Sequence, residues 1–402
     1  MNETAVVPAL NLAVIGAGPV GLSLALHAAR ALPQAQVTLF DARPLGLDVA
    51  RDPRTLALSL GSVQWLERLN AWNAEAAEAI LEVHVSQQPP SWSPFTRAEP
   101  ELRIRASDEG VAMLGAVLSH GQIVAPLQAA WLAASALEPT RLHTRFGTAV
   151  AAVKPLPLAV EVDAGIAERF DLAVVAEGGV FADQARKALT HDYRQTAWVG
   201  QVTLEGGTPG MAFERFTRHG PAALLPLKRD ATSGQARAAL VWCVPSDDDP
   251  VRELNDAQRL TVLASIFHPS VGRLTSVTPL KHFALGLNAE RSLVDGRTVR
   301  IGNAAQTLHP VAGQGLNLGL RDAYELVHSL AGNSDIDAVL RRLEWRRAPD
   351  RWSMIAATDF LARSFTWQLP GLGAARGLGL AALQALGPLK SALARQMMFG
   401  SR

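Results

Sequence analysis

The stretch Leu10-Asn-Leu-Ala-Val-Ile-Gly16-Ala-Gly18-Pro-Val-Gly21 decides the fold that this sequence predicts. A short apolar run, residues 10–15, ends at the first glycine, and a helical pattern of leucine and alanine follows the last. A second apolar run, residues 36–40, ends at Asp41. Strand, glycine turn, helix, strand and acidic residue together indicate a dinucleotide-binding unit, whereas an isolated G-x-G-x-x-G would be weak.

Each residue type in this unit has a physical reason to be there. Gly16 makes the tight turn, Gly18 lets a pyrophosphate approach the backbone, and Gly21 lets the helix pack on the strand. Asp41 is expected to accept hydrogen bonds from adenosine ribose hydroxyls. The alternative is a βαβ unit without a nucleotide. The candidate cofactor contacts here are Gly16, Gly18, Pro19, Val20, Gly21, Asp41 and Ala42.

A second glycine-rich stretch, Gly302-Asn-Ala-Ala-Gln-Thr-Leu-His-Pro310-Val-Ala-Gly313-Gln-Gly315-Leu-Asn317, follows a short predicted strand at residues 298–301 and leads into a helical pattern. Its glycines allow bare backbone amides to reach a flat ligand. The helix start offers unpaired N–H groups and the positive end of a dipole. The alternative is a glycine-rich turn before a core helix. The candidate contacts are Gly302, Asn303, Pro310, Gly313, Gly315, Leu316 and Asn317.

The size, charge and cysteine content of the chain exclude several classes of function. The chain has 402 residues, of which 48% are hydrophobic and 19% charged, and its net charge is +1. We therefore expect a globular protein of two or three domains that does not bind nucleic acid. Cys243 is the single cysteine, which excludes an intrachain disulfide and a cysteine-based metal site and fits a reducing, cytoplasmic setting. The histidines, among them His268, His282 and His309, lack metal-ligand spacing, so no metal is expected.

The start of the chain has no basic residue before its apolar run, so it does not resemble a signal peptide. No uninterrupted apolar run reaches 18 residues, so no membrane span is expected. Contact with the inner face of a membrane is left open. No acyl-transfer motif is present, and no residue is identified as a general base, so the catalytic residues are unassigned.

The remaining periodicity alternates between helices and strands. Residues 54–69 and 123–137 read as helices, and residues 171–176 as a buried strand. Short strands are expected at residues 141–146, 149–153 and 158–162. Runs between residues 196 and 285 alternate and are separated by turns, which predicts a mostly antiparallel sheet with one helix at residues 255–267. The chain is helical in pattern from residue 336 onward.

This order predicts an α/β fold in which a nucleotide-binding domain is interrupted by a sheet domain, because the glycine stretches near residues 16 and 302 must share one ligand if both are binding sites. The nucleotide-binding domain is expected at 1–80, 111–190 and 289–335, the sheet domain at 81–110 and 191–288, and a helical region at 336–402. That last region includes a basic run with two tryptophans. We interpret it as a solvated face on a helical lid, the alternative being a membrane or partner surface. The run consists of Arg341, Arg342, Arg346, Arg347 and Arg351.

Several segments together carry a family resemblance. They are the glycine unit ending at Asp41, Arg54 in the setting Arg-x-x-Ala-Leu-Ser, the stretch from Gly302, and two sheet segments, Tyr193-Arg-Gln-Thr-Ala and Phe213-Glu-Arg-Phe-Thr-Arg-His-Gly-Pro. From about residue 10 to 365 the chain resembles the class A flavoprotein aromatic hydroxylases, and most closely the polyprenylphenol hydroxylases of ubiquinone biosynthesis.

The resemblance implies a p-hydroxybenzoate hydroxylase-like fold whose FAD domain is of the Rossmann-like, glutathione-reductase type. It implies extended FAD, NAD(P)H as a transient reductant without a Rossmann site of its own, and O2 as co-substrate through a C4a-hydroperoxyflavin. The implied substrate is a polyprenylphenol, with association with other ubiquinone-biosynthesis proteins as a further expectation. The resemblance implies that Gln122 contacts the flavin. Arg54 is a candidate phosphate contact on its own account, because it places a cation just past the nucleotide turn, although a surface arginine is the simpler interpretation.

Two positions depart from the family pattern. Glu177-Gly178 replaces an Asp-Gly motif, and the longer side chain is expected to shift its contact to flavin or nicotinamide. Asn303 replaces an aspartate, keeps a hydrogen-bond acceptor and loses the charge, so flavin binding is expected to weaken only modestly. The second change resembles the methoxyphenol hydroxylase branch.

Two other functions compete with the hydroxylase. A scaffold subunit of a quinone-biosynthesis assembly is favoured by the changes at Glu177 and Asn303. A flavin-dependent reductase or dehydrogenase on the same fold would turn over substrate without consuming O2. Flavin absorbance and oxygen uptake separate the three.

Overall fold

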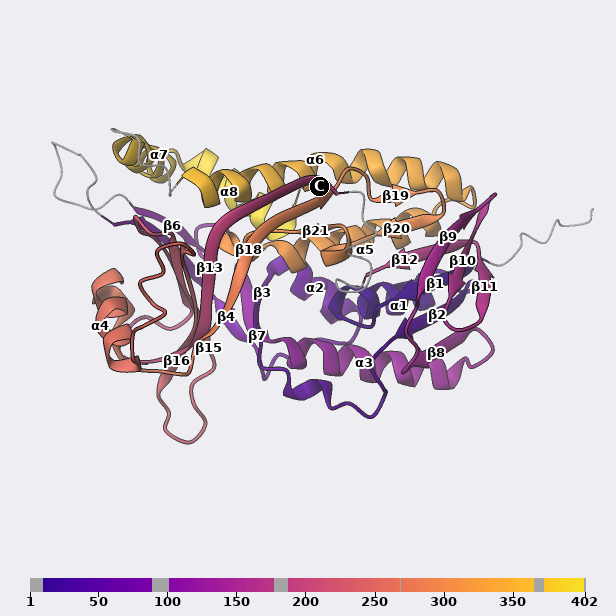
Figure 1. Ribbon diagram of the computed structural model, residues 1–402, viewed down its shortest axis with the longest axis horizontal. Helices are drawn as coiled ribbons and strands as arrows, with labels where there is room; N and C mark the ends of the chain where they lie inside the picture. Colours follow the sequence, from indigo (N-terminus) through magenta and orange to yellow (C-terminus); the bar gives the residue numbers. More distant parts are fainter. Residues whose placement is uncertain (1–9, 89–100, 177–186, 268, 365–371, 401–402) are drawn as a thin grey trace, which may run out of the picture.

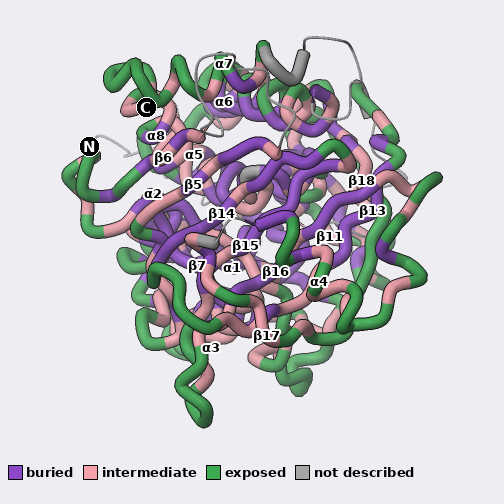
Figure 2. The backbone as a smooth tube through the Cα atoms, turned by 90° about the vertical axis from the view of Figure 1, so that its left-hand side faces the viewer, coloured by how far each residue is buried: buried purple, intermediate pink, exposed green. Residues whose placement is uncertain are grey.

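The computed structural model describes residues 10–88, 101–176, 187–267, 269–364 and 372–400. It has two bodies, a layered one on the right of Figure 1 and a sheet-based one on the left. Two long neighbouring strands, β13 (Lys187–Glu205) and β18 (Lys281–Glu290), run between them. In Figure 2 the buried segments lie mostly toward the centre of the molecule and the exposed segments mostly at its periphery.

A six-stranded sheet carries the glycine turn of the layered body. Neighbouring strands are parallel except for the first two in the spatial order. β1 lies inside the sheet and is covered on both faces, which explains its unbroken apolar run. The spatial order is β19 (Val294–Asp295), β20 (Thr298–Arg300), β12 (Leu172–Val175), β1 (Asn11–Ile15), β2 (Gln36–Asp41) and β8 (Leu142–Phe146).

The two faces of this sheet have different covers. Leu12 and Val14 point into a core to which three long helices, among others, contribute, whereas Ala13 and Ile15 point into a smaller core under a three-stranded layer. The helices are α1 (Pro19–Ala31), α3 (His120–Leu137) and α5 (Gly315–Ala331). The layer consists of β9 (Ala152–Leu156), β10 (Ala159–Asp163) and β11 (Ala167–Phe170), the last of which the sequence did not predict.

The helix predicted over residues 54–69 is wrong in its first part. The chain forms β3 (Thr55–Ser59) and then α2 (Leu60–Arg68). Leucine and alanine favour a helix, but β3 pairs antiparallel with β7 (Gly115–Ser119), and this pairing overrides the local preference. A side chain at Gly115 would put a Cβ 2.2 Å from the Leu58 carbonyl oxygen, so only glycine allows this approach. β4 (Glu78–Ile80) completes the small sheet.

The second body is built on a nine-stranded sheet with α4 (Asp256–Ile266) against one face. Its pairs are antiparallel except for that of β5 with β14. Besides β13 and β18 it contains β5 (Glu82–Gln87), β6 (Glu101–Arg105), β14 (Met211–Phe216), β15 (Pro221–Leu227), β16 (Ala236–Pro245), β17 (Arg273–Val277) and β21 (Gln306–Thr307). The sheet thus takes strands from several separate parts of the chain, and the exact domain limits stay a prediction.

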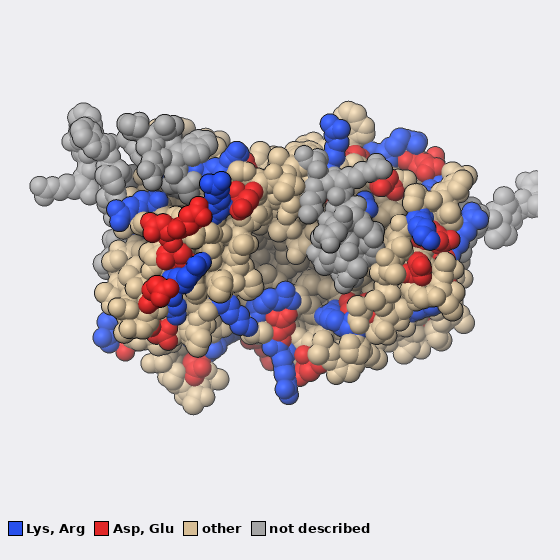
Figure 3. Space-filling model, in the orientation of Figure 1, with Lys and Arg blue, Asp and Glu red and all other residues tan. Residues whose placement is uncertain are grey.

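Three C-terminal helices run across both bodies: α6 (Ile336–Ser364), α7 (Leu372–Ala385) and α8 (Gly387–Phe399). Residues of α7 and α8 pack against the sheet on the face opposite α4. Within the described ranges, no helix combines the length and apolar character needed to cross a membrane. Figure 3 shows acidic and basic side chains interspersed on one face, in keeping with the near-zero net charge.

The interpretation of the basic run as a solvated face is wrong for two of its members. Arg347 is 6% exposed and Arg351 is 1% exposed, whereas Arg341, Arg342 and Arg346 are exposed. The turn of the helix directs these two arginines toward acidic groups inside, which the linear run does not reveal.

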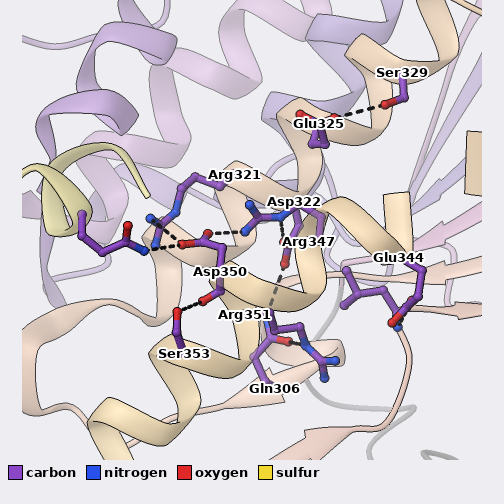
Figure 4. Close-up of polar contacts among 12 residues, drawn as sticks. Gln306, Arg321, Asp322, Glu325, Ser329, Glu344, Arg347, Asp350, Arg351 and Ser353 are labelled. Atoms are coloured by element: carbon purple, nitrogen blue, oxygen red, sulfur yellow. Dashed lines mark hydrogen bonds and ion pairs between the residues drawn. The ribbon is translucent and has the colours of Figure 1, made fainter. Parts of the chain in front are cut away.

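The two buried arginines belong to a network that fixes α5 against α6 (Figure 4). Arg347 Nε donates to Asp322 Oδ1 on α5 and Nη2 donates to Asp350 Oδ2, both at 2.6 Å. Arg351 Nε donates to Gln306 Oε1 at 2.7 Å. Burial alone would lower the pKa of Arg347, but the two carboxylates raise it further than burial lowers it.

Candidate active site

The turn between β1 and α1 can only be made with glycine at two positions. Gly16 has φ +102°, and its N–H donates to the Phe40 carbonyl oxygen at 2.8 Å. A Cβ on Gly21 would lie 1.9 Å from the Gly16 carbonyl oxygen. A Cβ on Gly18 would meet no protein atom within 4 Å, so the space before this backbone is open. Pro19 and Val20 form the first helical positions of α1 behind it.

The Asp41 carboxylate makes more hydrogen bonds within the protein than the sequence suggested. Its Oδ2 accepts from the Ala17 N–H at 2.6 Å, and its Oδ1 accepts from the Arg43 N–H at 2.7 Å. The Arg43 guanidinium also contacts both oxygens. Burial would raise the pKa of Asp41, but the hydrogen bonds from Arg43 and Ala17 hold it below its ordinary value. Asp41 therefore fixes the glycine turn; a contact with ribose stays a prediction, as does one for the adjacent, exposed Ala42.

Arg54 and Gln122 lie close together at the start of α3. The Arg54 guanidinium pairs with the Asp52 carboxylate, with Nη2 2.6 Å from Oδ2, and the Arg54 backbone carbonyl accepts from the His120 N–H. Gln122 Oε1 accepts from Asn73 Nδ2 at 2.8 Å. The side chains of Arg54 and Gln122, both predicted to contact the cofactor, thus have partners within the protein. The Arg54 side chain is 66% exposed. Their contact with a phosphate or flavin stays a prediction.

The structure brings the second glycine stretch against the first. Gly302, with φ +59°, opens a 3-10 turn after β20, and a Cβ there would lie 3.3 Å from Val20 on α1. A Cβ on Gly319 of α5 would lie 2.7 Å from Gly302 Cα. The end of β20, the start of α1 and the first turns of α5 therefore meet at one place. Asn303 is exposed beside it.

The loop before α5 presents a helix start into open space. A 3-10 turn, Val311–Gly313, follows Pro310, and α5 begins at Gly315. The N–H groups of the first three helical residues, Gly315, Leu316 and Asn317, have no carbonyl acceptor within the helix. A Cβ on Gly315 would meet no atom within 4 Å. The arrangement can hold a flat, electron-rich group and stabilise negative charge on it.

Two buried side chains hold this loop in place. Asn317, 1% exposed, accepts from the Ser59 N–H and the Ser62 hydroxyl at 2.8 Å and donates to the Gly313 carbonyl at 3.2 Å. Its side chain is therefore a brace between α2 and the loop. His309 Nδ1 accepts from the Val311 N–H, so its other nitrogen donates to Gln195 Oε1 at 3.0 Å. Burial lowers the pKa of His309 to about 4, which keeps the ring neutral.

An apolar cavity of about 310 Å³ lies beside this loop. Its walls come from the nine-stranded sheet, from β3, from the loop and start of α5, and from α7 and α8. Most lining side chains are aliphatic or aromatic, which excludes water from the space in front of the loop. Figure 3 shows that the molecule is hollowed between its two bodies on the face drawn there.

Sequence reasoning missed three residues of this region. Arg43, two positions after Asp41, and His309, just before Pro310, were visible as polar residues at the edge of a motif. Glu214 lines the apolar cavity, and nothing in its local pattern separates it from the neighbouring Arg215. Glu177 and Gly178, predicted to contact the cofactor, lie outside the described residues. Within the described ranges, no group of three potential metal ligands comes together.

Known proteins resemble this chain in sequence and in fold. Residues 181–354 match the family model of an FAD binding domain. The ubiquinone hydroxylase UbiL of Rhodospirillum rubrum is 29% identical over 96% of this chain and 89% of its own length. The 3-demethoxyubiquinol 3-hydroxylase of Escherichia coli is 29% identical over 94% of this chain and 96% of its own.

A solved structure extends the comparison to the whole fold. HpxO of Klebsiella pneumoniae, determined with FAD and uric acid, superimposes with a TM-score of 0.71 at 16% identity, covering 97% of each chain. The predicted fold class, an FAD-binding domain interrupted by a sheet domain with C-terminal helices, is confirmed. These matches support a flavin-dependent hydroxylase that is similar to the hydroxylases of ubiquinone biosynthesis.

Proposed function

We propose that this protein hydroxylates the ring of a polyprenylated phenol in ubiquinone biosynthesis, such as a 2-polyprenyl-6-methoxyphenol, using FAD, NAD(P)H and O2. The observation that carries the proposal is the apolar cavity, because its wall includes Pro310, Gly313, Gln314 and Asn317 at the start of α5. A ring bound there would lie beside the site proposed for the flavin. Two full-length relatives named for hydroxylation in ubiquinone chemistry support the substrate class.

The residues present fit an extended FAD. Open space lies before the backbone of Gly18 at one end and of Gly315 at the other, where any side chain would occupy the cofactor's place. When bound, FAD accepts a hydride from NAD(P)H and activates O2 for transfer to the ring. The proposed contacts are Gly16, Gly18, Pro19, Val20, Gly21, Asp41, Ala42, Arg54, Gln122, Glu177, Gly178, Gly302, Asn303, Pro310, Gly313, Gly315, Leu316 and Asn317.

The chain's own part in the reaction is placement and charge stabilisation. The N–H groups at the start of α5 point at the proposed flavin site and would stabilise negative charge on the reduced ring. Asn317 keeps those groups in place through its four side-chain hydrogen bonds. The apolar walls keep water away from the reacting oxygen, so that it is transferred instead of being lost as peroxide.

Purified protein is expected to retain FAD and to oxidise NAD(P)H faster when a short-tailed prenylphenol is present. The decisive measurement is mass spectrometry of the product after reaction under 18O2 in ordinary water. The expected product gains one labelled oxygen atom. A protein without bound flavin would support the scaffold alternative, and substrate turnover without O2 uptake would support the dehydrogenase alternative.

A long prenyl tail must leave the cavity, since about 310 Å³ is at the lower end of pockets that hold drug-sized ligands, roughly 300–1,000 Å³. Leu380, Leu383 and Leu393 of α7 and α8 line the cavity. On and between the same helices, Leu378, Leu386 and Leu389 are 67%, 53% and 52% exposed. We infer that the tail leaves beside α7 and α8 and that these leucines contact a membrane surface.

Binding to lipid vesicles is expected to depend on these leucines. The double change Leu378→Glu and Leu389→Glu should lower the vesicle-bound fraction at least about tenfold, because two leucines lose their burial in lipid. Flotation of the protein with phosphatidylethanolamine–phosphatidylglycerol vesicles measures this fraction. Leu137→Glu is the matched control, since Leu137 is 83% exposed on α3, and it should float like the wild type. Equal flotation of all three proteins would contradict the proposed surface.

A further inference from the structure

Glu214 is an acidic residue in an apolar wall. It lies on β14, where its neighbours across the ladder are Val85 on β5 and Ala223 on β15. Its side chain is intermediate in exposure, and the surface that it retains faces the cavity. Among the described residues that line this cavity, it is the only aspartate, glutamate, lysine or arginine. Its neighbour Arg215 points to the opposite face, where its guanidinium donates to the Ile266 carbonyl at 2.9 Å.

The carboxyl group of Glu214 has no protein partner among the described residues. Two fully buried acids, by contrast, are paired: Asp322 and Asp350 each contact Arg347 at 2.6 Å. A polar group held away from bulk water without a partner destabilises the fold, and more so if it is charged. A residue that only filled space at this position would be apolar like its neighbours, so the carboxyl group points to a ligand.

We propose that Glu214 accepts the hydrogen bond of the substrate's phenolic hydroxyl, orients the ring in the cavity and selects phenols over their ethers. This inference rests on the proposed function, because it assumes that a phenol enters the cavity. The wall places Glu214 and the start of α5 around the same space, so a ring held at Glu214 would lie between them.

The same contact would activate the ring. As the phenolic proton moves toward Glu214, the O–H bond of the phenol weakens, an O–H bond forms on the carboxylate, and electron density on the ring rises. The proton returns when the product leaves, so no net proton is consumed at this residue. Burial raises the pKa of Glu214 to about 8, closer to that of an ordinary phenol, about 10, which makes the transfer less unfavourable.

Few groups can disturb this titration. Of the described residues lining the cavity, only Cys243 on β16 is also titratable, and burial together with Glu214 raises the pKa of its thiol, so it stays neutral. The other elements facing Glu214 contribute uncharged side chains: Val83 and Val85 of β5, Ala223 and Leu225 of β15, Leu361 of α6, Met397 and Met398 of α8, and Gln314 and Asn317 near the start of α5. The ionised form of Glu214 accepts best, so phenol affinity should rise as the pH passes through about 8.

The test compares 2-geranylphenol with its methyl ether, which has the same shape but no hydroxyl proton to donate. Binding to the FAD-loaded protein is followed by the change in flavin fluorescence at several pH values. The wild type should prefer the phenol at least about tenfold at high pH, as expected for a charged acceptor. Glu214→Gln should reduce this preference to about twofold and remove its pH dependence.

Two controls separate the role of Glu214 from general damage. Glu205→Gln removes a carboxylate that is 51% exposed on β13 of the same sheet, and it should keep the preference. FAD content and the urea midpoint of Glu214→Gln should match the wild type. Equal binding of phenol and ether by the wild type, or an undiminished preference in Glu214→Gln, overturns the role of Glu214 while the hydroxylase function stands. If the wild type binds neither compound and its NAD(P)H oxidation is unchanged, the proposed function itself fails.

Discussion

Replacing Gly21 by alanine is expected to weaken FAD binding strongly. The new Cβ would lie 1.9 Å from the Gly16 carbonyl oxygen and 3.3 Å from the Ala176 Cβ, so the turn between β1 and α1 must open. Overpacking of this kind costs about 1–3 kcal/mol of stability and moves the helix start that we propose faces the pyrophosphate. We expect affinity for FAD to fall at least about a hundredfold, which corresponds to about 2.7 kcal/mol. Flavin absorbance per protein after gel filtration, and titration with FAD, measure the loss.

The matched variant Gly18→Ala distinguishes the ligand from the fold. Its Cβ would touch no protein atom within 4 Å, so the urea midpoint should stay at the wild-type value. The same Cβ would stand where the pyrophosphate is proposed to lie, so FAD affinity should still fall. Normal FAD binding in Gly18→Ala would show that the cofactor does not approach this turn.

Replacing Arg347 by methionine should destabilise the protein by about 3–5 kcal/mol. The change leaves the carboxylates of Asp322 and Asp350, both fully buried, without the guanidinium that contacts each at 2.6 Å. α5 would lose its fully buried ion pair with α6, so the loop that begins at Pro310 should loosen and FAD should dissociate more readily. Urea unfolding followed by circular dichroism gives the stability change.

The neighbouring arginine provides the control. Arg346 pairs with Glu325 at 2.7 Å, but its side chain is 53% exposed, and exposed pairs contribute about 0–1 kcal/mol. Arg346→Met should therefore change the urea midpoint little. Equal effects of the two substitutions would mean that the buried network does not hold α5 in place. Adding Asp322→Asn to Arg347→Met should recover part of the loss, because one uncompensated charge is removed.

The first βαβ unit was predictable because its determinants are local. The glycines, the apolar runs and Asp41 lie within a short stretch, and each has one physical role. The structure of residues 54–69 was not predictable, because the pairing of β3 with β7 joins residues that are far apart in the sequence. Asp322, one of the two partners of Arg347, likewise lies on another helix, so the sequence revealed the charge of Arg347 but not this ion pair.

Glu214 shows why the substrate side of the site was not predictable. Glu214 and Arg215 are adjacent polar residues on one strand, and alternation places one on each face. Both faces of β14 are covered, one by α4 and its core and the other by the cavity wall, so neither residue is marked as the exposed one. The alternation along β14 can be interpreted only when the elements that cover the two faces of the sheet are known.

The order of strands in the six-stranded sheet has a consequence for how the chain folds. β20 closes the free edge of β12, yet the chain supplies β20 only after most of the nine-stranded sheet has been made. During synthesis, the backbone N–H and C=O groups at that edge of β12 therefore stay unpaired until the second sheet has formed. Unpaired edges are templates for aggregation, and contacts between distant segments form slowly. A newly made chain thus depends on rapid assembly of its second body, or on chaperones, to protect the first.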